Sequence, residues 1–168
     1  SWPVDDIQSI TVIEDGPVCA ALRMTWRYLS STISQVIRIW RDSPQVDLGY
    51  EIDWQEEQIL LKTLFPVDVL SRQATYEIQY GNVQRPTHHN TSWDQARFEV
   101  CMHKWLDLSE EGYGVSILND SKYGCGIDGQ MISISLLKSE LHPNPDADKE
   151  HHSFTLSLLP HQGDWRSA

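Results

Sequence analysis

Residues 82–99 carry the side chains best suited to recognising a ligand. The stretch reads NVQRPTHHNTSWDQARFE, and it interrupts the alternation of apolar and polar residues found in most of the chain. Arginine, histidine, asparagine and aspartate beside an aromatic plane are the groups that recognise sugar hydroxyls, because a wrong ligand leaves them unpaired. The candidate site residues are Arg85, His88, Asn90, Trp93 and Asp94.

A structural interpretation uses the same residues. Asn90, Thr91 and Ser92 can hydrogen-bond nearby backbone, and Trp93 can plug the space beneath the loop. Either arginine of the stretch, Arg85 or Arg97, can also pair with the carboxylate of Asp94 or Glu99. The chemistry of the stretch favours neither interpretation, and both can hold at once.

The rest of the chain offers no recognisable catalytic or metal-binding pattern. There is no Gly-x-Ser-x-Gly turn, and none of the three cysteines lies in a nucleophile motif. Adjacent carboxylates, such as Asp5 and Asp6, point to opposite faces of an extended chain and make poor acid–base partners. The pairs His88–His89 and His151–His152 diverge in the same way, so they make poor ligand pairs for a metal. We expect neither a catalytic residue nor a metal ligand here.

Composition indicates a folded domain that binds no nucleic acid and crosses no membrane. The 168 residues are 40% hydrophobic and carry a net charge of -11, which disfavours a surface for phosphates. No apolar run is long enough to span a bilayer. Three cysteines are too few for a disulfide framework, which favours a reducing compartment and a cytoplasmic location. The start at Ser1 and the character of residues 1–15 suggest a connector within a larger chain.

Many short strands separated by turn residues predict an antiparallel β-sandwich with little helix, as one domain over residues 1–168. Arg97–Leu108 alternates, with Phe98 and Met102 on the apolar face, and predicts a single strand. Residues 141–152, LHPNPDADKEHH, predict a mobile surface loop. The other predicted strands are Val18–Tyr28, Ser31–Trp40, Tyr50–Gln55, Ala74–Tyr80, Ile132–Leu136 and Ser153–Leu159.

Residues 76–129, from YEIQYGNVQRPTHHNTSWD to SKYGCGIDG, resemble the C-terminal β-domain of glycoside hydrolase family 38 α-mannosidases. The likeness is to the cytosolic and bacterial branch, and it covers roughly two-thirds of the chain. Residues 51–69, 130–137 and 159–165 support it. The resemblance implies a sandwich of the galactose-mutarotase-like, or super-sandwich, type.

The resemblance also implies the activity of a parent enzyme. Family members remove terminal α-linked mannose from oligosaccharides with retention, using an aspartate nucleophile and a second carboxylic acid. A zinc ion held by His and Asp binds sugar hydroxyls. Those groups belong to the N-terminal catalytic domain, so none is assigned to this chain and Asp94 is not the nucleophile. We expect this stretch alone to be inactive and to have that catalytic domain as its partner.

Two loops are then candidates for the domain interface or for the rim of the sugar pocket. They are the Arg85–Asp94 stretch and residues 120–126, where Lys122 and Tyr123 stand on a turn. A plain hairpin using Gly124, Gly126 and Gly129 for positive φ is the alternative for the second loop. For the whole chain, the alternatives are a freestanding carbohydrate-binding module, for which Trp93 is the obvious exposed aromatic, and a purely structural interface domain.

Overall fold

The computed structural model describes residues 2–168, which are almost entirely β-structure. Strands take up 59% of the chain and helix 3%, and the sheets are antiparallel. The predicted all-β class with little helix is confirmed. Where the sequence predicts one domain, the chain divides into two compact units. Unit 1 holds the residues up to Leu60 with Leu137–Ser157, and unit 2 holds Leu61–Leu136 with Leu158–Ala168.

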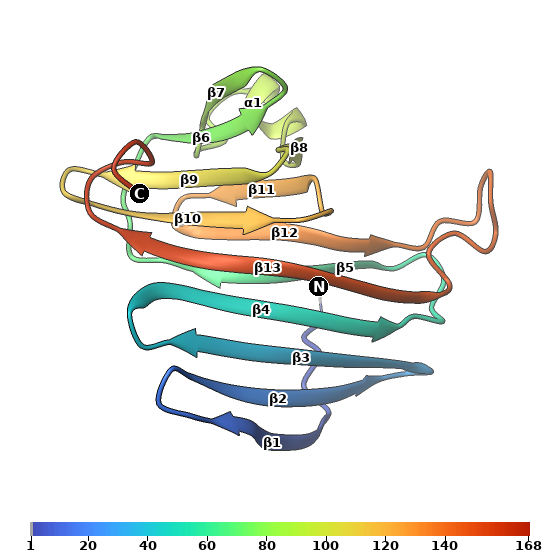
Figure 1. Cartoon of the computed structure of the whole chain (residues 1–168). Coiled ribbons are helices and arrows are strands. Elements are labelled where there is room, and N and C mark those ends of the chain that lie inside the picture. Colours follow the sequence, from blue (N-terminus) through green and yellow to red (C-terminus); the bar gives the residue numbers. More distant parts are fainter. Residues whose placement is uncertain (1) are drawn as a thin grey trace. The chain divides into compact units, whose positions relative to one another are not determined.

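Unit 1 is built on a meander of four antiparallel strands. They are β1 (Ile7–Asp15), β2 (Cys19–Tyr28), β3 (Ser31–Trp40) and β4 (Ser43–Asp53), which pair in chain order (Figure 1). Strand β13 (His151–His161) lies next to β4, and its residues up to Ser157 belong to this unit. Long strands rich in β-branched residues therefore form most of unit 1.

One face of this meander is apolar across all four strands. Val12, Leu22, Ile37 and Leu48 stand directly opposite one another in register, so their side chains share a face. Leu48 is buried, whereas Leu22 is 40% exposed and Val12 66% exposed. The face is thus covered at β4 and increasingly open towards β1. We call its open part the β1–β3 apolar face; its exposed members are Ile10, Val12, Leu22 and Ile39.

Unit 2 contains two sheets. One sheet has the order β13, β10, β9, β6, β7 and the other the order β5, β12, β11, β8. The first comprises the end of β13 with β10 (Tyr113–Asn119), β9 (Trp105–Glu110), β6 (Gln73–Ile78) and β7 (Gly81–Pro86). The second comprises β5 (Leu60–Pro66), β12 (Met131–Lys138), β11 (Gly124–Asp128) and β8 (Val100–Cys101).

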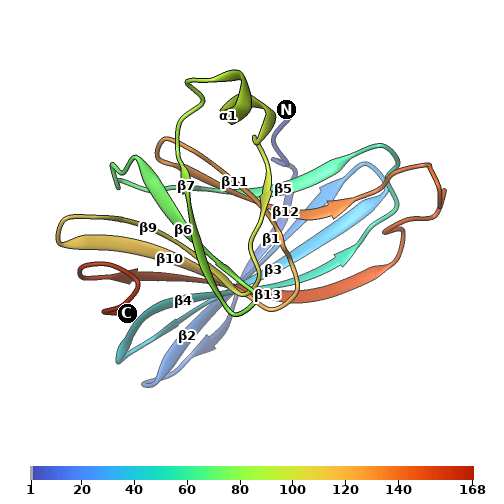
Figure 2. The ribbon, with the colours of Figure 1, turned by 90° about the horizontal axis from the view of Figure 1, so that it is seen from above.

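The two sheets of unit 2 pack as a sandwich around an apolar core. Leu106 and Ile117 of the first sheet are fully buried, as are Ile132 and Ile134 of the second. Figure 1 shows β11 and β12 behind β9 and β10, and Figure 2 shows them as separate layers from above. Each strand turns its apolar residues to the other sheet, as the alternation in the sequence predicts.

The predicted strand Arg97–Leu108 is wrong in its middle. It is divided into β8 and β9, and Phe98 is 68% exposed rather than on a core face. The break arises because the Met102 N–H donates to the Tyr123 carbonyl at 2.9 Å and the His103 N–H to the Glu77 carbonyl at 2.9 Å. Tyr123 lies directly before β11 of one sheet and Glu77 lies in β6 of the other, so the chain passes from one sheet to the other between Met102 and His103.

Two segments that were expected to lie outside the strands contribute residues to them. Residues 1–15, expected to be a connector, include the nine-residue strand β1, which pairs along its length with β2. Within the predicted loop at 141–152, His151 and His152 begin β13, while residues 141–150 lie outside the strands. The mobility of that loop stays a prediction. No helix in residues 2–168 is both long and apolar enough to cross a membrane.

The tryptophans of the predicted strands are buried to different degrees. Trp54 is fully buried and its indole N–H donates to Ser139 Oγ at 3.2 Å. Trp26 and Trp105 are half-buried, while Trp40 is 38% exposed and its indole N–H donates to Asp47 Oδ2 at 2.8 Å. Only Trp54 is a full core residue among these four.

An exposed histidine at the start of β13 should make stability depend on pH. His151 Nδ1 lies 2.9 Å from Asp53 Oδ1 and Nε2 lies 2.8 Å from Glu51 Oε2. The hydrogen bond to Asp53, followed by that to Glu51, raises the pKa of His151 above its usual value. A raised folded-state pKa gives stability that is complete below the unfolded pKa and is lost as pH rises through the folded pKa.

We therefore expect His151→Gln to lower the Tm at about pH 5.5 and to have little effect at about pH 9, because only the protonated imidazole donates to both carboxylates. Thermal melts across this range measure the difference. His142→Gln, at an exposed histidine of the neighbouring loop, is the matched control. An equal pH dependence in the wild type and His151→Gln would exclude this contribution.

Candidate functional site

A one-turn helix, α1 (Ser92–Ala96), organises the tip of the predicted loop. The Asp94 N–H donates to Thr91 Oγ1 at 3.1 Å, and the Asp94 carboxylate accepts from the Thr91 N–H at 3.1 Å and the Thr91 hydroxyl at 2.7 Å. This is a reciprocal capping box at the helix start. The hydrogen bond from the Thr91 side chain is the largest cause that lowers the pKa of Asp94. Asp94 is therefore an ionised cap.

The base of the loop is anchored by Thr87, which is buried. Its hydroxyl donates to the Ser71 carbonyl at 2.5 Å, and its own carbonyl accepts from the Gly129 N–H at 2.8 Å. Gly129 has a φ of +58°, which glycine adopts without strain. The loop is thus tied at its base to two turns distant in sequence and capped at its tip.

Arg85 is held by contacts other than the predicted carboxylate pair. Its guanidinium donates to the Cys101 carbonyl at 3.2 Å and lies 4.8 Å from the ring centroid of Tyr76. Tyr76 is buried, and burial raises the pKa of its hydroxyl. Glu99, one of the predicted partners, lies instead 3.4 Å from Lys62 Nζ. The stacked arginine joins β7 to β6 and β8, so its head group is fixed in place.

Two neighbouring histidines reach Asp94 from different sides. His88 Nδ1 lies 4.0 Å from the Asp94 carboxylate, whereas His89 Nδ1 lies 3.3 Å from the Asp94 backbone carbonyl. His89 Nε2 also lies 3.9 Å from Asp128 Oδ1. Within residues 2–168, no group of three or more His, Cys, Asp or Glu side chains is arranged to hold a metal ion. The resemblance places the zinc ligands of the parent enzyme in its catalytic domain, so no zinc chemistry is assigned to the described residues.

A small pocket lies between this loop and the strands below it. Its volume of about 20 Å³ suits one water molecule and not a sugar ring. It brings together three predicted residues, Arg85, His88 and Asp94, and adds His89 and Arg97, which the sequence did not single out as site residues. Their polar character was visible in the sequence, but their convergence depends on α1.

The other two predicted residues of the loop face solvent. Asn90 is exposed and Trp93 is 74% exposed, and neither lines the pocket. The interpretation of Trp93 as a hydrophobic plug is wrong, because the capped turn directs it outward. The loop thus has a rigid polar interior with an exposed amide and an exposed indole on its outside.

The turn carrying Lys122 and Tyr123 is organised by Asn119. The Asn119 side chain accepts from the Lys122 N–H at 2.7 Å and donates to the His103 carbonyl at 2.8 Å. Tyr123 is partly exposed and its ring centroid lies 5.6 Å from that of His103. Neither residue lines the pocket at Arg85. The structure therefore does not bring the two predicted loops into one cavity.

Glycines in this region act through close approach more than through turn conformation. Gly124 and Gly126 lie in β11 without positive φ, so the predicted hairpin role holds only for Gly129. A Cβ on Gly126 would lie 2.6 Å from the Phe98 carbonyl oxygen, and one on Gly124 would lie 3.0 Å from Glu99 Oε1. The Phe98 backbone can therefore lie this close to β11 only because Gly126 lacks a side chain, whereas the contact at Gly124 would be with the end of the flexible Glu99 side chain.

Comparisons with known proteins agree on one family. Residues 1–146 match the model described as "Glycosyl hydrolases family 38 C-terminal domain". The chain is 48% identical over 139 residues to human "Alpha-mannosidase 2C1", covering 83% of this chain and 13% of that protein. It is 41% identical over 162 residues to "Alpha-mannosidase G" of Dictyostelium discoideum, covering 94% of this chain and 15% of that protein. The chain thus spans about an eighth to a seventh of these relatives.

A solved structure shares the fold. The structure of an α-mannosidase from Enterococcus faecalis V583 superposes with a TM-score of 0.81 at 17% identity, over 92% of this chain and 22% of that one. A family 36 α-galactosidase from Geobacillus stearothermophilus has a TM-score of 0.53 at 9% identity. At these identities the likeness concerns the fold alone.

Substitution of Gly126 should loosen the whole site region. We expect Gly126→Ala to destabilise unit 2 by about 1–3 kcal/mol, because the new Cβ forces the Phe98 backbone away from β11. Chemical denaturation measures the loss. Gly81→Ala is the matched control, since its Cβ would meet nothing within 4 Å. Equal stabilities of the two variants would show that the approach at Gly126 is not limiting.

Proposed function

The chain belongs to the glycosyl hydrolase family 38 C-terminal domains, and from this premise we propose that it is a non-catalytic domain of a retaining, exo-acting α-mannosidase. In that enzyme it packs on the catalytic domain and lends the Arg85–Asp94 loop to the rim of the sugar pocket. The substrate is a terminal α-linked mannose on an oligosaccharide. The nucleophile, the acid and the zinc site belong to the rest of the parent protein, which we expect in the cytoplasm.

The observation that carries the rim proposal is the construction of the Arg85–Asp94 loop. Its interior is fixed by the Thr91–Asp94 capping box and by the Arg85 contact with Cys101, yet Asn90 and Trp93 face solvent. A rigid loop that presents an amide and an indole can orient sugar hydroxyls with little loss of entropy on binding. The pocket beneath is too small for a sugar, so the rest of the binding surface must come from another part of the enzyme.

The β1–β3 apolar face supports the docking part of the proposal. Ile10, Val12, Leu22 and Ile39 are all exposed on one side of a sheet whose opposite end is covered. A sheet stabilises a fold by burying its apolar face against a second layer, and a contiguous exposed apolar patch marks an interaction surface. The catalytic domain, or a β-layer joined to it, is the partner that we propose for this face.

A freestanding carbohydrate-binding module is the second candidate function. Trp93 is strongly exposed, and Phe98 is exposed on the same segment. Aromatic side chains of this kind can stack on a pyranose ring. This alternative needs the isolated chain to bind sugar through Trp93, whereas the leading proposal needs Trp93 only within the assembled enzyme.

Substitutions in the loop separate a rim role from a purely structural one. In the full-length enzyme, we expect Asn90→Ala to lower kcat/KM for an aryl α-mannoside about ten-fold, the equivalent of one lost hydrogen bond, at unchanged Tm. Asn82→Ala, an exposed asparagine on β7, is the matched control. Loss of Tm without a change in rate would leave the loop a structural role only.

A charge on the β1–β3 apolar face should disturb docking. We expect Val12→Lys to lower the Tm and the activity of the full-length enzyme, because the buried lysine loses its hydration. Thr11→Lys is the matched control, since Thr11 is opposite Arg23 on the other face of the sheet. Differential scanning calorimetry and turnover of an aryl α-mannoside report both effects. If the two variants behave alike, this face does not dock on a partner.

A further inference from the structure

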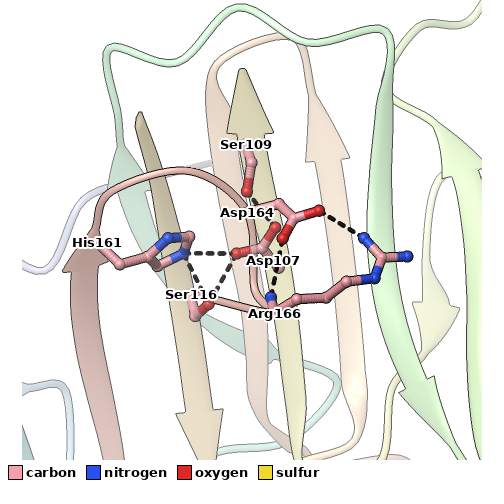
Figure 3. A network of polar contacts seen from close by, with 6 residues as sticks. All are labelled: Asp107, Ser109, Ser116, His161, Asp164 and Arg166. Atoms are coloured by element: carbon pink, nitrogen blue, oxygen red, sulfur yellow. Dashed lines mark hydrogen bonds and ion pairs between the residues drawn. The ribbon is translucent and has the colours of Figure 1, made fainter. Parts of the chain in front are cut away.

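A buried polar network on the outer face of the first sheet joins β9 and β10 to His161, the last residue of β13, from which the C-terminal segment (residues 162–168) continues (Figure 3). His161 Nε2 lies 2.7 Å from Asp107 Oδ2, and their side chains are only 5% and 2% exposed. The Ser116 hydroxyl donates to the same Asp107 oxygen at 2.8 Å, and the Ser109 hydroxyl donates to the other one. Both carboxylate oxygens are thus occupied, which fixes Asp107 although it is removed from solvent.

This network does not form a catalytic triad. Ser116 Oγ lies 3.2 Å from His161 Nε2, the same nitrogen that contacts Asp107. A triad needs the aspartate on one ring nitrogen and the serine on the other. His161 Nδ1 is buried without a hydrogen-bond partner among the described residues. The arrangement fixes groups in place and activates no nucleophile.

A cavity of about 240 Å³ opens beside Asp107, between the C-terminal segment and strands β6, β7 and β9. It is much larger than the 20 Å³ pocket at Arg85, and all its lining residues belong to unit 2. The lining is mostly polar, with carboxylates, amides, hydroxyls and one indole. Its principal members are Gln73, Gln84, Asp107, Glu110, Asp164 and Trp165.

The charged side chains that line the cavity disfavour an anionic ligand. Asp107, Glu110 and Asp164 face the cavity, and the guanidinium of Arg166 donates to Asp164 at 2.5 Å. The backbone N–H of Arg166 is the largest cause that lowers the pKa of Asp164, so this carboxylate stays an acceptor. An anion would meet three carboxylates here. Among residues 2–168, no group of three or more His, Cys, Asp or Glu side chains is placed to hold a metal ion.

One wall of the cavity is apolar. The Trp165 ring centroid lies 5.0 Å from that of Trp105, and the Arg166 guanidinium lies 4.5 Å from the Trp165 ring. The contacts with Trp105 and Arg166 thus fix the orientation of the Trp165 indole. An oriented indole beside carboxylate and amide groups combines the two features that a pyranose requires, a surface for C–H groups and partners for its hydroxyls.

We propose that this cavity, between the C-terminal segment and strands β6, β7 and β9, is a second binding site for a neutral hexopyranose. It is separate from the Arg85–Asp94 loop and from the chemistry of the parent enzyme. Carboxylates and amides of the lining accept from and donate to the sugar hydroxyls. The Asp107 network sets the floor, and Trp165 forms the side wall.

Fluorine NMR of the chain labelled with 5-fluorotryptophan tests the site, with methyl α-mannoside as the probe. We expect the Trp165 resonance, assigned through Trp165→Phe, to shift and saturate, while the Trp93 resonance stays in place. Gln84→Trp, on the edge strand β7, should fill the cavity and abolish the shift. Asn82→Trp is the matched control, because it stands two residues earlier on the same strand and face and does not line the cavity.

Each outcome decides the question. Inorganic phosphate should leave the Trp165 resonance unchanged, and a phosphate shift as large as that of the sugar would overturn the assignment of a neutral ligand. If the labelled chain has the same Tm as the unlabelled chain but its Trp165 resonance shows no saturable shift with the sugar, the proposed site does not exist. A shift confined to Trp93, or one that persists in Gln84→Trp, would place sugar binding elsewhere. None of these results depends on turnover by the parent enzyme, so the rim proposal is tested separately.

Discussion

The approach of residues 98–101 to β11 is the constraint on which the candidate site depends. Strand β8 is only two residues long, and just before it the Phe98 carbonyl oxygen leaves no room for a Cβ at Gly126. Through that contact the Cys101 carbonyl is placed where Arg85 can donate to it, and Arg85 in turn lies on Tyr76. The loop and its capped helix are therefore fixed to the core of unit 2 by backbone contacts more than by ion pairs.

Local sequence signals identify best those strands that pair with neighbours close in the chain. The β-branched enrichment of Ser31–Trp40 predicts a strand with the bounds of β3, whose two partners precede and follow it by short turns. Arg97–Leu108 alternates, but the N–H groups of Met102 and His103 bond to Tyr123 and Glu77. Those partners lie far enough along the chain that no local pattern identifies them.

The same reasoning explains which site residues could be found from sequence. Polar residue types indicate the Arg85–Asp94 loop, and in the structure Arg85, His88 and Asp94 line one small pocket. The exposure of Trp93 depends on the helical turn α1, whose capping signal in the sequence is Thr91 followed three residues later by Asp94. The sequence around Asp107 does not indicate that this residue is buried, because a polar residue on an alternating strand normally faces water.

The burial of Asp107 argues that the C-terminal segment is ordered for a reason beyond stability. An ion pair or polar network removed from water gives little net stabilisation, because desolvation offsets its attraction. The network around Asp107 instead fixes the position of His161, which must contact the carboxylate while Ser109 and Ser116 donate to it. That placement determines where the C-terminal residues begin to cross the sheet, and with them the positions of Asp164 and Trp165. A segment needed only to cover the sheet would do so more favourably with apolar side chains, whereas one that must hold a polar cavity open requires such a fixed point.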